Sequence, residues 1–294
     1  MRQSLALAIA LVSGPAALAA QAPPGTEVYL APLTARGGRP VIGTAVNLTN
    51  RAGYDNQPSF TPDGRGLYYT VIGADGHADV RRIDLASGRS SPFITTDPES
   101  EYSPTPMPDG REVAVIRVEA DSSQRLWAFP VAGGEPRLLL ERVEPVGYQA
   151  WLDRGRVGVF VLGSPATLQL ADLHTGEATI LLSSIGRALQ KVPGKDLLSV
   201  THQIAADRWY LTLVDPESRA VDHLIAMPPG ADYYAWLPDG SALTASGAAF
   251  YHFRPGRDAE WVSLGAVAGV RGISRIAVSP NGRQVAFVGN EGGN

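Results

Sequence analysis

The chain has no cysteine among its 294 residues. It therefore contains no disulfide, no thiol nucleophile and no metal site built from cysteine, and it cannot carry the lipid anchor of a lipoprotein. Hydrophobic residues make up 44% of the sequence, which is enough to bury a large core without covalent cross-links.

Lysine is also scarce, because Lys191 and Lys195 are the only two, and the arginines form no cluster. The formal net charge is −4. Proteins that bind nucleic acid or anionic membranes gain most of their affinity from dense positive charge. The sequence therefore predicts neither a nucleic-acid partner nor insertion into a membrane.

Long hydrophobic runs are missing, since the apolar run at residues 5–12 is too short to span a bilayer as a helix. Arg2 precedes this run, a Ser-Gly-Pro break follows it, and an Ala-Leu-Ala sequence ends at Ala19. This order of features is typical of a secretory signal peptide. We predict a Sec-type signal peptide at residues 1–20, cleaved after Ala19 or Ala20, one domain at residues 21–294, and a periplasmic or secreted protein.

What the sequence does contain is a Pro-Asp-Gly-like turn that recurs six times between short apolar runs. The glycines of these turns are Gly64, Gly110, Gly155, Gly194, Gly240 and Gly282, spaced 39 to 46 residues apart. A repeat of this length with a strand on each side of a turn is typical of a β-propeller blade. The sequence thus predicts an all-β, six-bladed β-propeller with four-stranded antiparallel blades.

Local chemistry explains why these turns form. Pro62 fixes φ near the value needed at the second position of a type I turn, Asp63 can accept a hydrogen bond from the backbone that follows, and Gly64 can adopt the left-handed conformation that reverses the chain. No segment after the signal peptide shows a sustained 3.6-residue apolar period. We therefore expect almost no helix in the mature chain.

The two ends of the chain each hold part of a blade. The sixth turn copy, residues 273–288, supplies two strands, whereas the predicted strands at 27–31 and 41–49 have no turn copy of their own. We expect the N-terminal strands to complete the last blade, because this closes the ring and leaves no exposed sheet edge between the first and last blades.

The repeat resembles that of a known family. A Ser-Phe-Thr-Pro-Asp-Gly-Arg sequence starting at Ser59, followed by an apolar strand and then by Ile-Asp-Leu at 83–85 with Gly88, resembles the TolB-type (WD40-like) propeller repeat. The resemblance covers residues 27–289, which is the propeller only and not the α/β domain that precedes it in TolB. It implies an exported propeller with a protein or peptide partner in the cell envelope. Related repeats also occur in propellers of peptidases, so the motif is specific for the fold and not for one function.

Residues that could support catalysis or bind a metal show no recognisable spacing. The histidines His77, His174, His202, His223 and His252 are scattered, and there is no Gly-x-Ser-x-Gly sequence. Asn56 and Asp232 occupy equivalent repeat positions, but two possible ligands are too few for a calcium site. We therefore expect no catalytic residue, no metal site and no cofactor.

Aromatic residues fall into two groups along the repeat. Phe60, Trp151 and Trp236 share one position near the end of the first strand of their blades, which predicts a place in the core between blades. The second group lies just before the inner strands, in loops expected to surround one mouth of the axial channel. The candidate partner-binding residues there are Tyr102, Tyr148, Tyr233, Arg187, Arg275 and Asp232, and Tyr54 and Tyr234 lie in the same zone.

Tyrosine and arginine are frequent anchors in protein interfaces, although tyrosine also packs at strand edges. The sequence therefore predicts a monomeric, non-enzymatic scaffold that binds a protein or peptide at the channel mouth, while packing between blades remains the alternative role of the tyrosines. The alternative function is a metal-dependent propeller enzyme, of the lactonase or polysaccharide-lyase type, with a site on the axis.

Overall fold

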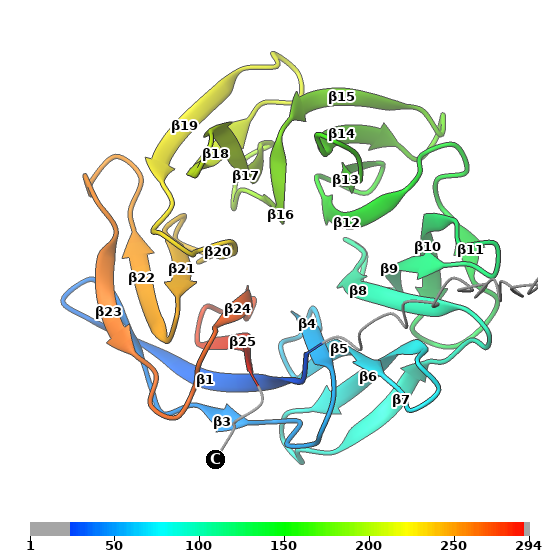
Figure 1. Cartoon of the computed structure of the whole chain (residues 1–294), viewed down its shortest axis with the longest axis horizontal. Helices are drawn as coiled ribbons and strands as arrows, with labels where there is room; N and C mark the ends of the chain where they lie inside the picture. Colours follow the sequence, from blue (N-terminus) through cyan, green and yellow to red (C-terminus); the bar gives the residue numbers. More distant parts are fainter. Residues whose placement is uncertain (1–23, 291–294) are drawn as a thin grey trace, which may run out of the picture.

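Six antiparallel sheets surround a central axis in the computed structural model, which describes residues 24–290 (Figure 1). Blade 1 consists of β4 (Asp55–Phe60), β5 (Gly66–Ile72), β6 (Ala78–Asp84) and β7 (Ser90–Ile94). Blade 2 consists of β8 (Ser100–Pro106), β9 (Glu112–Val118), β10 (Gln124–Pro130) and β11 (Arg137–Leu138). Blade 3 consists of β12 (Val146–Trp151), β13 (Arg156–Val161), β14 (Thr167–Asp172) and β15 (Ala178–Ser183). Blade 4 consists of β16 (Ile185–Lys191), β17 (Leu198–Ala205), β18 (Arg208–Val214) and β19 (Val221–Ala226). Blade 5 consists of β20 (Tyr234–Trp236), β21 (Ala242–Ser246), β22 (Ala249–Phe253) and β23 (Val262–Ala266). The described residues contain no helix, so the predicted six-bladed, all-β propeller is confirmed.

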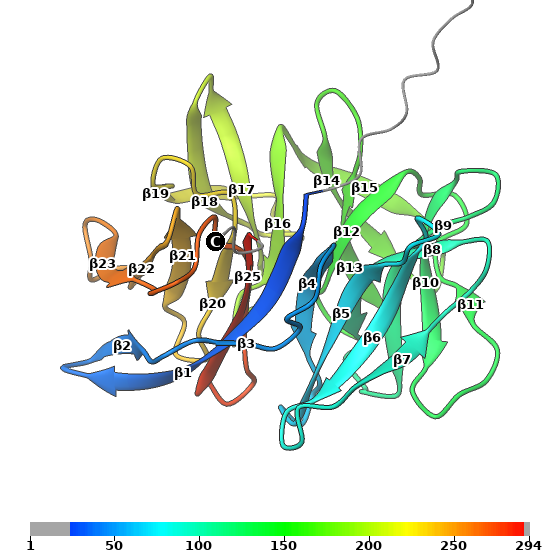
Figure 2. The same ribbon diagram turned by 60° about the horizontal axis from the view of Figure 1, so that its bottom comes forward.

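Blade 6 combines both ends of the described chain, as predicted. It consists of β24 (Ser274–Val278), β25 (Gln284–Asn290), β1 (Thr26–Arg36) and β2 (Arg39–Ile42). Strand β1 pairs antiparallel with β25, from Thr26 opposite Asn290 to Pro32 opposite Gln284. Figure 2 shows β1 lying beside β25 at the junction of the first and last blades. The ring is therefore closed by main-chain hydrogen bonds between the two ends of the propeller.

The N-terminal strands differ from the prediction in their extent. Strand β1 continues to Arg36 and forms a hairpin with β2, and the predicted second strand is divided into β2 and β3 (Val46–Asn47), both of which pair with β1. The division falls at Gly43, whose N–H donates to the carbonyl of Pro32 at 2.8 Å. Arg39 in the hairpin forms an ion pair of 2.9 Å with Asp258 of blade 5, which fixes the hairpin to its neighbour.

The turns between the two inner strands of each blade have the predicted geometry in four copies. In the first, the N–H of Gly64 donates to the carbonyl of Thr61 at 2.9 Å, and φ of Gly64 is 69°. The third copy differs, because Gly155 does not have positive φ and the carboxylate of Asp153 instead accepts from the N–H groups of Gly155 and Arg156. In blade 4 the N–H of Lys195 instead donates to the carbonyl of Val192 at 3.2 Å, so that Gly194 lies one position earlier in the turn.

The hydrophobic core lies in the seams between neighbouring blades. Apolar side chains from facing sheets meet at each of the six seams. Phe60, Trp151 and Trp236 are between 6% and 8% exposed, which confirms their predicted place in the core. Trp236 packs in the seam between blades 4 and 5, where its indole N–H donates to the hydroxyl of Ser199 at 2.8 Å.

The region that the structure describes includes no helix suited to cross a membrane. The predicted signal peptide at residues 1–20 lies outside the described residues.

Candidate functional site

The first strands of the six blades surround the axis (Figure 1); they are β4, β8, β12, β16, β20 and β24. Their side chains leave two cavities along the axis. We call the end of the channel where these inner strands begin the upper mouth, and the end where they reach the hairpin turns the lower mouth. One cavity, of about 420 Å³, extends toward the lower mouth, where Trp151, Lys191 and Pro280 line it. The other, of about 510 Å³, opens at the upper mouth beside Tyr54, Tyr102 and the loop residue Gly163.

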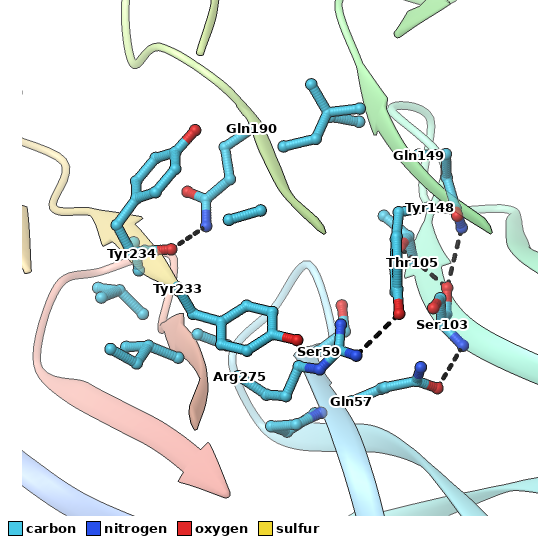
Figure 3. Close-up of a pocket in the computed structure, with 18 of the residues that line it drawn as sticks. Gln57, Ser59, Ser103, Thr105, Tyr148, Gln149, Gln190, Tyr233, Tyr234 and Arg275 are labelled. Carbon is cyan, nitrogen blue, oxygen red and sulfur yellow. Dashed lines mark hydrogen bonds between the residues drawn. The ribbon is translucent and has the colours of Figure 1, made fainter. Parts of the chain in front are cut away.

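Three side chains meet between the two cavities. The guanidinium of Arg275 donates a hydrogen bond of 2.8 Å to the hydroxyl of Tyr148. Its carbon Cζ lies 4.7 Å from the ring centre of Tyr148 and 4.4 Å from that of Tyr233. Figure 3 shows Arg275 between the two tyrosines, with the hydrogen bond drawn. We call Tyr148, Tyr233 and Arg275 the axial cluster.

A distortion of the inner strand β24 directs Arg275 toward the axis. Arg275 has φ of 49°, in the left-handed region that residues other than glycine rarely adopt. The strand pairing shifts at this point, between Ser274 and Ala277. Gln57 and Ser103 have the same left-handed backbone at the corresponding shifts in blades 1 and 2. Because a β-bulge redirects the side chain of the extra residue, the bulge explains how Arg275 reaches the channel.

The channel is positively charged, although the whole chain is negative. Among the described residues that line the two axial cavities, Arg187, Lys191 and Arg275 are basic and none is acidic. Lys191 forms an ion pair with Asp196 at 3.3 Å, whereas neither Arg187 nor Arg275 has a carboxylate partner in the part of the chain that the structure describes. Burial raises the pKa of Tyr54 to about 12 and also raises the pKa of Tyr233, so these tyrosines stay neutral and do not offset the positive charge.

Two buried carboxyl groups lie near the starts of β4 and β8, outside the cavity walls. Asp55 is paired with Arg51 at 2.7 Å, and Glu101 is paired with Arg117 at 3.3 Å and bonded to the hydroxyl of Thr96. Burial raises the pKa of Asp55 to about 6 and that of Glu101 to about 7, although the neighbouring arginines oppose this shift. Since each carboxyl group already has its own arginine, neither neutralises the arginines of the channel.

The structure brings all six candidate residues to the upper mouth. Tyr102, Tyr148, Arg187 and Arg275 line the upper axial cavity. Arg187, Asp232 and Tyr233 line a third cavity of about 280 Å³ beside it. Four of the six lie on the inner strands themselves, and not in the loops before them as predicted, because the strands begin several residues earlier than the apolar runs indicate.

The tyrosines of this zone have different surroundings. Tyr102 packs partly against the core between blades 2 and 3, and Tyr148 makes an edge contact with Phe160, with ring centres 5.5 Å apart. Tyr234 is 1% exposed and donates its hydroxyl to Ser199 at 2.8 Å, so it belongs to the core and not to the mouth. The axial tyrosines thus combine packing between blades with a face toward the channel.

Three glutamines of the channel wall were missed by the sequence analysis. Gln57 accepts a hydrogen bond from the N–H of Ser103, Gln149 donates to the carbonyl of Ser103, and Gln190 bonds both Tyr234 and Trp236. Figure 3 shows the glutamines extending from one inner strand to the next. Their distances from the turn glycines differ, so the repeat does not group them. The signal that the sequence offered for these glutamines was a polar side chain in a strand that has a hydrophobic core on each side.

The described residues include no group of three or more His, Asp and Glu side chains that could hold a metal ion. Two of the scattered histidines do meet, because the rings of His202 and His223 stack in blade 4 with their centres 5.1 Å apart. Burial, and to a lesser degree the neighbouring His223, lowers the pKa of His202.

Comparisons with known proteins gave matches in structure. No protein-family model and no curated protein sequence matches the chain. A protein assigned as TolB from Agrobacterium tumefaciens has a TM-score of 0.73 at 15% identity, over 92% of this chain and 99% of that one. TolB from Acinetobacter baumannii has a TM-score of 0.52 at 18% identity, over 65% of this chain and 50% of that one. An oligogalacturonate lyase in complex with manganese has a TM-score of 0.59 at 13% identity, over 84% and 80% of the two chains.

At these identities the likenesses show the fold alone. They agree with the resemblance found in the repeat sequence, and the chain has a six-bladed β-propeller of the TolB type.

Proposed function

We propose that this protein is an exported, non-enzymatic propeller that binds a protein or peptide partner at the upper mouth of its channel. The observation that carries the proposal is the axial cluster, in which an arginine with no carboxylate partner among residues 24–290 is held between two tyrosines. Tyrosine and arginine provide large contact areas and directed hydrogen bonds, and they dominate the binding energy of many interfaces. The rigid blades hold these side chains in place, which lowers the entropy lost on binding.

The size of the mouth suits a segment of chain. The upper axial cavity of about 510 Å³ adjoins the third cavity of about 280 Å³, and both are lined by Arg187. Pockets of this size bury a small ligand or a few residues of a peptide. The likeness to TolB structures and the predicted signal peptide both support a place in the periplasm or outside the cell.

Crosslinking in native cell envelopes followed by capture of the protein tests this function. The wild type should retain a defined protein, and a variant with Tyr148→Ala and Tyr233→Ala should lose most of it. Asp222→Ala, an exposed change on the outer strand β19, is the control. Equal capture by the wild type and the double variant would place the binding surface elsewhere.

A metal-dependent enzyme is the second candidate, because the oligogalacturonate lyase with manganese has a similar fold. Such an enzyme would need metal ligands on the axis, where the described lining residues supply mainly glutamine, serine and tyrosine. Elemental analysis of the purified protein, with melting temperatures in added calcium and manganese, distinguishes the candidates. A stoichiometric ion that stabilises the protein would favour the enzyme.

A further inference from the structure

The channel arginines are placed to receive an anion. The guanidinium of Arg275 has five N–H donors. Among the described residues it donates one hydrogen bond, to the hydroxyl of Tyr148. The rings of Tyr148 and Tyr233 lie within 4.7 Å and 4.4 Å of Cζ, so the plane of the guanidinium is fixed. A fixed guanidinium fork with free donors matches the two oxygens of a carboxylate.

Arg187 provides a second positive charge at the same place. Its side chain is exposed, and it lines both axial cavities together with Arg275. The two arginines repel each other, and the one acidic residue nearby, Asp232 in the third cavity beside Arg187, balances at most one of the two charges. An anionic group between the arginines would relieve this repulsion. The protein as a whole has a net negative charge, so this pair of arginines is a local positive feature of the channel.

Part of the wall beside the arginines is apolar. Ile116, Val118, Phe160, Leu162 and Ala166 line the upper axial cavity, and Leu162 is 41% exposed. An apolar side chain would bury these groups favourably, while Tyr54, Gln57, Tyr102 and Gln124 supply polar groups to the same cavity. The apolar part of the wall therefore offers a place for an apolar side chain of the peptide that bears the anion.

From these observations we propose that Arg275 and Arg187 bind a carboxylate of the partner peptide, next to an apolar side chain that enters the upper axial cavity. This inference rests on the proposed function and specifies its ligand chemistry. The carboxylate comes either from the C-terminus of the peptide or from an Asp or Glu side chain, and both sources offer the same two oxygens.

The test uses affinity selection with three mixtures of acetylated octapeptides of random uncharged sequence, read out by mass spectrometry. One mixture has a free C-terminal carboxylate, one has a C-terminal amide, and one has the amide together with a single internal Glu. We expect retention of the first or third mixture to exceed that of the second by about tenfold or more, and to fall as ionic strength rises. The better of the two identifies the source of the carboxylate.

Variants connect the effect with the two arginines. Arg187→Gln combined with Arg275→Gln should reduce retention of the carboxylate peptides about tenfold or more, while the amide peptides change little. Arg89→Gln, an exposed arginine in the outer turn of blade 1, should leave retention unchanged. If the double variant does not fold, Arg187→Gln alone should still weaken retention about threefold, because its side chain is exposed.

The outcomes separate this inference from the proposed function. Equal retention of carboxylate and amide peptides by the wild type would overturn the inference while the binding function stands. Retention of none of the three mixtures, together with loss of envelope partners, would overturn both. Binding of oligogalacturonate without retention of any peptide would show that the anion belongs to a saccharide and would overturn the peptide ligand.

Discussion

Arg275 of blade 6 donates a hydrogen bond of 2.8 Å to the hydroxyl of Tyr148 of blade 3, across the axis of the ring. The two residues are 127 positions apart in the sequence and belong to opposite blades, so their contact depends on the closure of the whole propeller. Because both residues line both axial cavities, the bond lies between the upper and lower parts of the channel. The position of the Arg275 guanidinium in the channel therefore depends on the closed ring.

The first prediction concerns the role of the axial tyrosines. Truncating Tyr148 and Tyr233 to alanine should weaken partner binding by a few kcal/mol, since a truncated hot spot typically costs about 2 kcal/mol or more. Loss of the edge contact between Tyr148 and Phe160 should also lower the free energy of unfolding by about 1 kcal/mol. Partner affinity and the denaturation midpoint are measured on the same protein.

Tyr233→Phe keeps the ring and provides the control, because the hydroxyl of Tyr233, unlike that of Tyr148, has no hydrogen bond among the described residues. It should retain the stability of the wild type. A strongly destabilised alanine variant with unchanged partner affinity would mean that the rings serve only to pack the blades.

The second prediction concerns the core between blades 4 and 5. Trp236→Ala should reduce the free energy of unfolding by roughly 3–5 kcal/mol, because it removes a buried indole and leaves a cavity. Asp239→Ala removes a turn carboxylate that accepts from the N–H of Ser241 and should cost only about 1 kcal/mol. Denaturant titration compares the two, and equal midpoints would contradict the place of Trp236 in the seam.

The third prediction concerns ring closure. Deleting residues 24–49 removes β1, β2 and β3, which exposes the edge of β25 and the apolar faces that β1 covers. The truncated protein should aggregate or melt at a clearly lower temperature, as measured by size-exclusion chromatography and thermal unfolding. Val46→Ser, a change at a side chain that is 59% exposed, should leave both measurements unchanged. A monomeric truncation with the melting temperature of the wild type would show that closure contributes nothing.

The fourth prediction follows from the buried carboxyl groups. Burial raises the pKa of Glu101 from 4.5 to about 7 and that of Asp55 from 3.8 to about 6. The folded protein then binds more protons than the unfolded chain between these values, so the contribution of both groups to stability is greatest at low pH and is lost as the pH rises through this window. Glu101→Gln should therefore compare more favourably with the wild type at about pH 8 than at about pH 5.

Denaturation midpoints of the wild type and Glu101→Gln at the two pH values provide the measurement. Glu135→Gln, at an exposed position, serves as the control and should show no such difference. A constant difference between Glu101→Gln and the wild type across the pH range would mean that Glu101 keeps its charge in the folded protein.

Several features of the fold were predictable because they depend on local chemistry. The turn that contains Gly64 forms from the conformational preferences of three adjacent residues. The closure of blade 6 was also predictable, since an unpaired half blade at each end leaves one arrangement without an open edge. The tertiary structure was needed for the division of β2 from β3, because it depends on the contact between Gly43 and Pro32.

For the site, the sequence by itself determined which residues stand near the start of each inner strand, including Tyr148, Tyr233 and Arg275. It could not determine that Arg275 lies between the two tyrosines, because that contact joins blades 3, 5 and 6 and requires a bulge that turns the arginine toward the axis. Nor could it determine that the described walls of both axial cavities hold no acidic residue, since Asp55 and Glu101 lie beside the mouth in sequence yet point to arginines of their own. The repeat in the sequence determines where along each blade a residue lies. The direction of its side chain at the start of a strand depends on sheet twist and ring closure, which only the tertiary structure decides.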